Sequence, residues 1–285
     1  MADRVEIFEV GPRDGLQNEP GFIPTDQKVA LIEALAEAGF ARIEAASFVS
    51  PKWVPQMADG AEVMAGVRRR PGLGLWGLTP NMRGYEAAIA AKADGVAVFA
   101  SASEGFSRAN LNCSIAESID RFAPILTEAL SRGLPVRGYV SCVTDCPYDG
   151  AVAPGDVADV AERLFAMGCS EISLGDTIGK GQPERVDAML GAVLDHVPAE
   201  RLAGHYHDTD GRALENIEVS LKRGLRIFDS AVGGLGGCPY APGAAGNVAT
   251  EAVLDRLTAL GFETDLDPTA VRRAAQMARA LRASG

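Results

Sequence analysis

The chain has 285 residues, 47% of them hydrophobic and 23% charged, and this composition excludes an intrinsically disordered protein. Its 38 acidic residues outnumber its 27 Lys and Arg residues, and the formal net charge of −11 argues against nucleic acid as a partner. No apolar run reaches the roughly 18 residues that a membrane-spanning helix needs, so we expect no membrane partner either.

Eight short apolar runs alternate with amphipathic stretches along the chain. Several runs are rich in Val and Ile, which is typical of buried parallel strands. The predicted strands are residues 5–10, 42–46, 73–78, 96–100, 136–143, 171–174, 202–207 and 227–232.

Helices are predicted between these strands, because apolar residues recur three and four positions apart, as in residues 157–164. Ser114 and Glu117 have the spacing of a capping box at the start of one helix. Glycines occur where the helices should end, since glycine readily adopts the left-handed conformation that terminates a helix. These glycines are Gly39, Gly133, Gly168, Gly224 and Gly261.

The spacing of the glycines reveals a repeat of one strand and one helix. Gly133 and Gly168 lie 35 residues apart, and Gly224 and Gly261 lie 37 apart. Eight such units account for nearly the whole chain and favour a (β/α)₈ TIM barrel, although alternation alone also fits an open doubly wound sheet. We therefore predict an α/β barrel, with residues 1–285 as a single domain and an extra helix from Asp267 onward.

The five cysteines are an odd number, and no secretory signal or transit peptide is visible before the first apolar run. We therefore expect a cytoplasmic protein with reduced thiols. Cys142 and Cys146 lack the CxxC spacing of zinc and redox sites, so we interpret them as structural thiols.

In a (β/α)₈ barrel the active site lies at the carboxyl ends of the strands, so polar residues that follow the apolar runs are candidates. Arg13 and Asp14 follow the first run, between Gly and Pro residues that predict a turn. Glu44 lies inside the second run. A buried carboxylate is costly without a partner, so Glu44 should pair with another side chain or bind a ligand.

Two of the three histidines, His205 and His207, lie together at the end of the seventh run. Residues i and i+2 of a strand point to the same face, so both imidazoles should enter the mouth of the barrel. Two core histidines satisfied by hydrogen bonds are the alternative. The paired arrangement favours a divalent cation, which neutral imidazoles bind well.

A Gly-rich segment follows the eighth run, with six Gly and two Pro among residues 233–247. Long loops of this kind in compact domains are usually functional. The segment contains Cys238 and Asn247, and a thiol in a flexible loop at the catalytic end is more reactive than a buried one.

The chain resembles the 3-hydroxy-3-methylglutaryl-CoA lyase family, a branch of the metal-dependent barrels called DRE-TIM metallolyases. The resemblance covers nearly the whole chain, and the segments that carry it are Glu9–Asn18, Ser47–Met57, Ser173–Gly179, His205–Thr209 and Gly236–Tyr240. The HxH pattern alone would indicate only the wider superfamily, whereas the five segments together are specific.

This resemblance implies cleavage of (S)-3-hydroxy-3-methylglutaryl-CoA to acetyl-CoA and acetoacetate, as in leucine degradation and ketone body formation. It implies Mg²⁺ or Mn²⁺ as the cofactor and no bound nucleotide other than the CoA of the substrate. The implied metal ligands are Asp14, His205, His207 and Asn247. The implied catalytic residues are Cys238, Arg13, Asp14, His205 and Glu44, and the implied substrate-binding residues are Arg13, Gln17 and Asp176.

Within this resemblance, Arg13 polarises the substrate and Cys238 transfers a proton, while Asp14 and His205 are both candidates to accept the hydroxyl proton. The chain departs from the family pattern at Asp210, where relatives commonly have an aromatic or small residue, and Arg212 lies close by. A related, larger 3-hydroxy-3-alkylglutaryl-CoA is therefore an alternative substrate.

Two other functions are alternatives. A synthase of the same superfamily would condense acetyl-CoA with a 2-oxo acid, but the Cys238 loop and the lack of a regulatory domain favour a lyase. A non-catalytic acyl-CoA or metal sensor conflicts with the intact set of candidate residues. We expect a homodimer or larger homo-oligomer, since barrels of this kind are often dimers.

Overall fold

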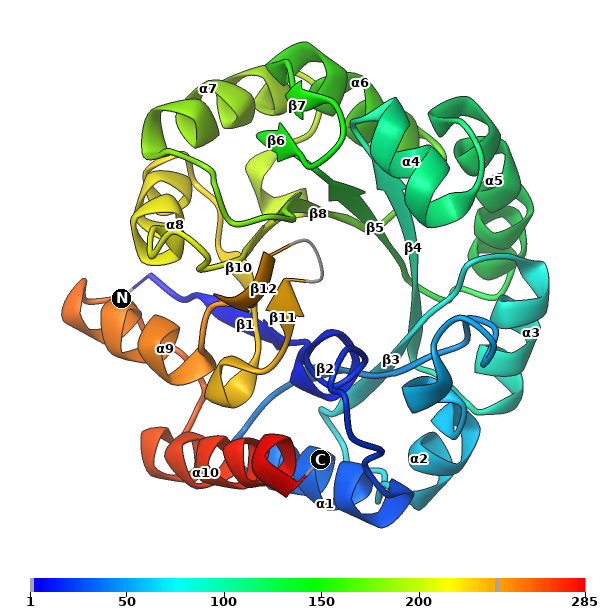
Figure 1. Cartoon of the computed structure of the whole chain (residues 1–285), viewed down its shortest axis with the longest axis vertical. Coiled ribbons are helices and arrows are strands. Elements are labelled where there is room, and N and C mark those ends of the chain that lie inside the picture. The colour runs from blue at the N-terminus through cyan, green and yellow to red at the C-terminus, as the bar shows by residue number, and fades with distance from the viewer. Residues whose placement is uncertain (1–2, 239–240, 285) are drawn as a thin grey trace.

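Eight parallel strands close into a barrel in the computed structural model, which describes residues 3–238 and 241–284. Around the barrel the strand order is β1-β10-β9-β8-β5-β4-β3-β2, so the last barrel strand pairs with the first (Figure 1). The bounds are β1 (Glu6–Glu9), β2 (Arg42–Ser47), β3 (Gly74–Leu78), β4 (Gly95–Ser101), β5 (Val136–Ser141), β8 (Glu171–Asp176), β9 (Leu202–Tyr206) and β10 (Ile227–Ser230). The predicted fold class is confirmed.

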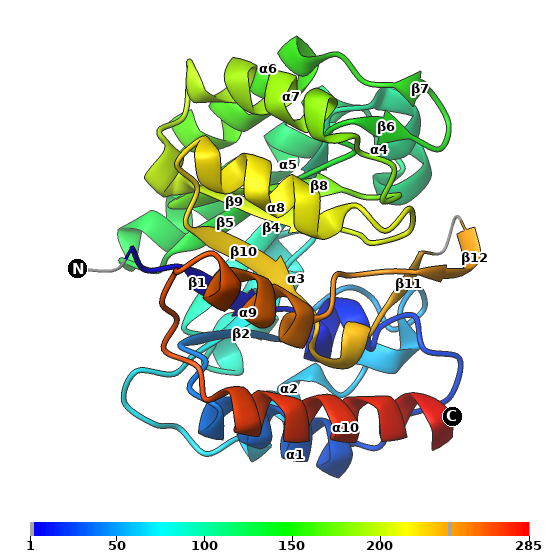
Figure 2. The same cartoon turned by 90° about the vertical axis from the view of Figure 1, so that its left-hand side faces the viewer.

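A ring of helices covers the outside of the barrel (Figure 1). The ring consists of α1 (Thr25–Glu37), α2 (Gly60–Gly66), α3 (Met82–Ala90), α5 (Ile115–Ser131), α6 (Pro154–Ala166), α7 (Pro183–Leu194), α8 (Ala213–Lys222) and α9 (Thr250–Ala259). Helix α10 (Pro268–Ser284) lies beyond this ring and packs beside α1 (Figure 2). It is the extra helix that the sequence predicts.

The predicted helix ends are also confirmed. Ser114 caps α5 as part of a capping box, in which its Oγ accepts a hydrogen bond from the Glu117 backbone and the Glu117 side chain accepts one in return. All five predicted helix-ending glycines have positive φ, between 66° at Gly133 and 107° at Gly168. Residues other than glycine rarely adopt this conformation, so these glycines mark where the helices before them end.

Several elements have no counterpart in the sequence-based prediction. They are the π-helix η1 (Gly11–Gly15), the 3₁₀-helices η2 (Pro55–Met57), η3 (Ala199–Arg201) and η4 (Val232–Gly234), helix α4 (Glu104–Leu111), the hairpin β6 (Asp145–Cys146) with β7 (Gly150–Ala151), and the hairpin β11 (Gly237–Cys238) with β12 (Ala241–Ala245). All except η3 follow the carboxyl end of a barrel strand. Figure 2 shows both hairpins at that end of the barrel.

The apolar core lies mainly between the strands and the helices, where the side chains of both layers are buried. Charged and polar side chains that are also buried lie on the barrel strands, among them Glu44, Arg137 and Asp229. In the part of the chain that the structure describes, no helix is both long and apolar enough to cross a membrane.

Candidate active site

The π-helix η1 holds Arg13 and Asp14 at the mouth of the barrel. The backbone N–H groups of Arg13, Asp14 and Gly15 all lie within 3.2 Å of the Val10 carbonyl oxygen, so one acceptor at the end of β1 gathers three donors. Pro12 suits the first turn of this helix, because proline has no N–H to leave unpaired there. The tight coil directs the two adjacent side chains into the site.

Arg13 is held between two carboxylates and is only 5% exposed. Its Nη2 lies 2.5 Å from Glu44 Oε2, and its Nη1 donates to Asp14 Oδ1 at 2.6 Å. Tyr139 donates its hydroxyl hydrogen to the same Glu44 oxygen at 3.2 Å. Burial alone would lower the pKa of Arg13, but the Glu44 and Asp14 carboxylates raise it, so the guanidinium stays charged.

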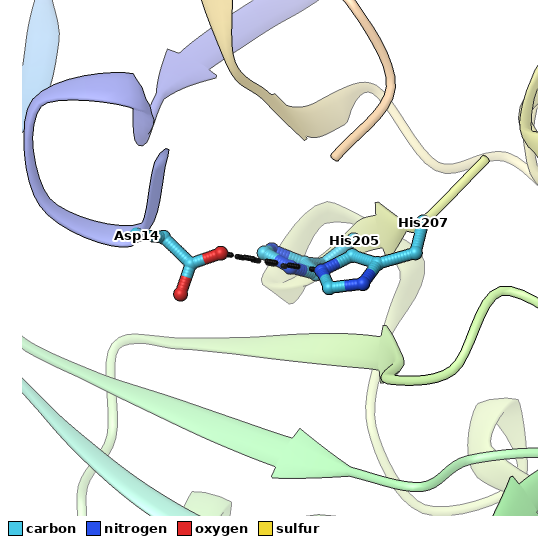
Figure 3. A group of neighbouring side chains, drawn as sticks. All are labelled: Asp14, His205 and His207. Atoms are coloured by element: carbon cyan, nitrogen blue, oxygen red, sulfur yellow. Dashed lines mark ion pairs between the residues drawn. The ribbon is translucent and has the colours of Figure 1, made fainter. Parts of the chain in front are cut away.

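Asp14, His205 and His207 form a cluster that could hold a metal ion (Figure 3). Asp14 Oδ2 lies 4.0 Å from the Nε2 atom of each histidine. Burial opposes ionisation of Asp14, but Arg13 and the two imidazoles lower its pKa below the usual range. The same-face arrangement that the sequence predicts for the two histidines is present, with ring centroids 5.4 Å apart.

His205 is oriented by a buried carboxylate on the neighbouring strand β10. Asp229 Oδ2 lies 3.0 Å from His205 Nδ1 and also accepts a hydrogen bond from Ser173. Burial works against a charged imidazole, but the hydrogen bond and charge of Asp229 raise the pKa of His205. A hydrogen bond at Nδ1 leaves Nε2, the atom that faces Asp14, free to bind a metal.

His207, the last residue of the predicted strand, lies one residue beyond the observed end of β9 and forms an isolated antiparallel bridge with Asn247. Burial, together with the nearby His205, lowers the pKa of His207 to about 4. The imidazole is therefore neutral near pH 7, which is the form that binds a metal. Its buried Nδ1 atom has no hydrogen-bond partner among the described residues.

Asn247 meets the cluster through its side chain. Its Nδ2 donates to Asp14 Oδ2 at 2.8 Å and lies 3.4 Å from the Leu235 carbonyl oxygen. The amide nitrogen therefore faces Asp14 in this arrangement. Binding a cation would require the amide to rotate so that its oxygen faces inward.

The cluster fits a divalent cation by the chemistry of its donors. One ionised carboxylate and two imidazole nitrogens converge at separations that exclude direct hydrogen bonds between them and leave room for an ion. Carboxylate oxygen with imidazole nitrogen suits Mn²⁺ and, with oxygen ligands completing the shell, Mg²⁺.

The other predicted site residues lie in three separate parts of the chain. Gln17 Nε2 donates to Asp14 Oδ1 at 3.2 Å, so Gln17 joins the cluster from the end of η1. Asp176 ends β8 and is 1% exposed, with its oxygens accepting from Thr144 Oγ1 and the Gly181 backbone. Cys238 belongs to β11, and its side chain lies outside the part of the chain that the structure describes.

Sequence reasoning missed Arg137 and Asp229, although both are charged residues inside predicted apolar strands, the same signal that identified Glu44. Arg137 Nη2 lies 2.5 Å from Asp229 Oδ1 and its Nε lies 2.8 Å from Glu171. Arg137 Nη1 also donates to the Tyr139 hydroxyl at 3.3 Å. The guanidinium thus links His205, through Asp229, with Arg13, through Tyr139 and Glu44.

Replacing Asp229 with asparagine should weaken Mn²⁺ binding about 10- to 100-fold, because the amide cannot match both the His205 and the Arg137 donors. The dissociation constant is measured from the electron paramagnetic resonance signal of free Mn²⁺. Asp187→Asn, which alters an exposed carboxylate paired with Arg223 outside the barrel, is the control and should bind Mn²⁺ normally. A folded Asp229→Asn protein with unchanged Mn²⁺ affinity would contradict this role.

A family model and curated relatives both match nearly the whole chain. A family model described as HMGL-like matches residues 4–278. The mitochondrial hydroxymethylglutaryl-CoA lyase of Bos taurus is 55% identical over 93% of this chain and 81% of its own length. A protein of Pseudomonas aeruginosa named 3-hydroxy-3-isohexenylglutaryl-CoA/hydroxymethylglutaryl-CoA lyase is 55% identical over 97% of this chain and 92% of its own length.

Solved structures agree in fold. The HMG-CoA lyase of Brucella melitensis is 62% identical, with a TM-score of 0.98 over 99% of this chain and 100% of that one. An HMG-CoA lyase of Acinetobacter baumannii in complex with coenzyme A and 3-methylmalate is 37% identical, with a TM-score of 0.94 over 99% of this chain and 92% of that one.

Proposed function

Because the chain belongs to the HMGL-like family, we infer that it is a lyase that cleaves a carbon–carbon bond of 3-hydroxy-3-methylglutaryl-CoA, giving acetyl-CoA and acetoacetate. This is the reaction of leucine degradation and ketone body formation. The observation that carries the inference for these residues is the meeting of Arg13 and Asp14 with His205 and His207 at the mouth of the barrel.

The proposed metal ligands are Asp14, His205, His207 and Asn247. A divalent cation bound there, Mg²⁺ or Mn²⁺, supplies Lewis acidity that makes the C3 hydroxyl of the substrate easier to deprotonate. Asp229 holds His205 in the tautomer that leaves Nε2 available. Asp14 and His205 are the two candidates to accept the hydroxyl proton, because both belong to the cluster that would hold the metal.

Arg13 is the proposed electrostatic catalyst. Breaking the C2–C3 bond leaves the electron pair on the future acetyl-CoA, as an enolate whose negative charge lies on the thioester oxygen. A guanidinium that is always charged and held by Glu44 is well suited to stabilise that oxygen. Gln17 and Asp176 are proposed to contact the substrate, Gln17 from beside Asp14 and Asp176 from the end of β8.

Cys238 is the proposed donor of the proton that the enolate carbon takes up. Its strand β11 follows η4 at the carboxyl end of β10, and η1, which carries Asp14, follows the carboxyl end of β1. Both elements therefore belong to the same end of the barrel, where Figure 2 shows β11. A thiol is a stronger acid than a serine hydroxyl, which suits it to protonate a carbanion near neutral pH.

A larger acyl group is the second candidate substrate. The Pseudomonas aeruginosa relative carries 3-hydroxy-3-isohexenylglutaryl-CoA in its name as well as the methyl compound. Asp210 and Arg212 lie in the segment between β9 and α8, and Arg212 pairs with Glu215. Comparing kcat/KM for the methyl and isohexenyl substrates decides which acyl group the site prefers.

Incubating the purified protein with Mg²⁺ and 3-hydroxy-3-methylglutaryl-CoA tests the proposed reaction. We expect acetoacetate and acetyl-CoA in equal amounts. Condensation of acetyl-CoA with a 2-oxo acid, in place of cleavage, would instead identify a synthase, and binding without turnover would identify a sensor.

The remaining proposals concern the cellular compartment, the domain organisation and the oligomeric state of the enzyme. The four cysteines whose side chains are described are free thiols, which supports a reducing compartment such as the cytoplasm. Its relatives are named both mitochondrial and cytoplasmic. We propose one catalytic domain per chain and a homodimer or larger homo-oligomer, which light scattering on the purified protein measures.

A further inference from the structure

Glu9, the last residue of β1, is fully buried, and three hydrogen-bond donors converge on its carboxylate. The backbone N–H groups of Gly11 and Val232 donate to Oε1 at 2.8 and 2.9 Å. The Thr250 hydroxyl donates to Oε2 at 2.7 Å. The donors are far apart in the sequence, so the carboxylate joins three separate segments.

Each of these segments leads to a part of the candidate site. Gly11 opens η1, which carries Arg13 and Asp14. Val232 opens η4, from which the chain continues into β11. Thr250 opens α9 and lies three residues after Asn247.

We propose that Glu9 is a positioning residue that sets the distance between Asp14 and Asn247 through the geometry of its three hydrogen bonds. The inference rests on the proposed metal ligand set, since each of those two residues lies three residues along the chain from a donor to Glu9, Asp14 from Gly11 and Asn247 from Thr250. Glu9 itself touches neither of them in the described contacts.

The packing around the carboxylate shows that its position is tightly set. A Cβ atom added at Gly11 would lie 2.5 Å from Glu9 Oε1 and 3.3 Å from the Val232 nitrogen. The turn into η1 can therefore approach the carboxylate this closely only with glycine at residue 11. A side chain there would push either Glu9 or the start of η1 out of place.

The three hydrogen bonds to Glu9 depend on the length and position of its side chain, not on its negative charge. Burial raises the pKa of Glu9 to about 7, against the effect of the three hydrogen bonds, so the carboxyl is not strongly held in its charged form. A glutamine oxygen can accept from both N–H groups. Its NH₂ can donate to Thr250 Oγ1 if the Thr250 hydroxyl hydrogen turns toward Ser230. This is possible because the two hydroxyl oxygens are 2.7 Å apart and either can be the donor.

Two substitutions at Glu9 separate these properties. Glu9→Gln keeps the length of the side chain and loses the charge, whereas Glu9→Asp keeps the charge and is too short to reach all three donors. We expect Glu9→Gln to bind Mn²⁺ within about threefold of the unmodified protein, and Glu9→Asp to bind it about tenfold more weakly, as for other residues that orient metal ligands.

Thr250→Val tests the same link from the other side and should also weaken Mn²⁺ binding. Thr258→Val is its control, because Thr258 lies on the same helix and its hydroxyl donates only to the Leu254 carbonyl in the described contacts. Glu6→Gln, at the opposite end of β1 and paired with Arg42, is the control for Glu9. Both controls should bind Mn²⁺ normally.

The Mn²⁺ dissociation constant is measured by electron paramagnetic resonance on proteins whose folding is checked by circular dichroism and melting temperature. A purely structural role would lower the melting temperature of Glu9→Asp without changing its Mn²⁺ affinity, and this result would overturn the inference. Equal weakening by Glu9→Gln and Glu9→Asp would overturn it too, because charge would then be the property in use.

Asp14→Asn, measured in the same way, separates this inference from the proposed site. If Asp14→Asn weakens Mn²⁺ binding and Glu9→Asp does not, only the role of Glu9 is wrong. If Asp14→Asn also binds Mn²⁺ normally, the ligand set is wrong and the role of Glu9 falls with it.

Discussion

Replacing Arg13 with glutamine will lower kcat about 10²- to 10³-fold, the usual loss when one group that stabilises a developing oxyanion is removed. KM should change little, because the charge that Arg13 meets appears only as the carbon–carbon bond breaks. Steady-state rates of acetoacetate release, together with Mn²⁺ affinity, provide the measurement. Arg226→Gln, which alters an arginine paired with Asp3, is the control.

Arg13→Gln also leaves Glu44 buried without its ionic partner, which typically costs about 3 kcal/mol or more of folding free energy. The double variant Arg13→Gln/Glu44→Gln separates the two effects, since it removes the unpaired charge. We expect it to recover most of the melting temperature and none of the lost kcat. An unchanged kcat in folded Arg13→Gln would assign Arg13 to structure alone.

Replacing Cys238 with serine will lower kcat on the order of 10²-fold or more, the range over which a well-positioned general acid acts. Affinities for Mn²⁺ and for a substrate analogue should be retained, because the change removes an acidic proton and leaves the proposed ligands intact. Cys238→Ala should behave in the same way. Near-normal turnover by both variants would remove Cys238 from the mechanism.

Thiol reagents provide a second measurement on the same residue. Among the cysteines whose side chains the structure describes, none is more than 9% exposed. Burial raises the pKa of Cys169 to about 12 and raises that of Cys142 as well, so both react slowly. Iodoacetamide should therefore inactivate the enzyme mainly through Cys238, and a bound analogue should slow the reaction. The Cys113→Ser protein should be inactivated at the normal rate.

The barrel could be predicted because its signals are local. A Val- and Ile-rich run predicts a buried strand, and a glycine such as Gly168 marks a helix end that the backbone conformation requires. The pairing of His205 with His207 followed from the two-residue period of a strand. Glu44 was identifiable because a carboxylate inside an apolar run needs a partner, and Arg13 proves to be that partner.

The rest of the site depends on contacts between distant residues, which local patterns do not contain. The bridge between His207 and Asn247 spans 40 residues of chain, and the hydrogen bond from Thr250 to Glu9 joins the two ends of the barrel sequence. The π-helix η1 was predicted as a turn, because its form depends on three donors sharing the Val10 carbonyl. Asp229 could have been identified from the sequence, because it is a charged residue within a predicted apolar strand, but it was missed by reasoning from motifs.

The rate of acetoacetate formation, measured against the amount of bound Mn²⁺ in the same samples, tests the central claim most directly. Protein stripped with a chelator should be inactive, and activity should rise in proportion to Mn²⁺ bound, reaching its maximum at one ion per chain. The Asp14→Asn and His205→Ala proteins should bind Mn²⁺ weakly and remain slow. Full acetoacetate formation by the metal-free protein, or normal Mn²⁺ binding by both variants, would contradict the account.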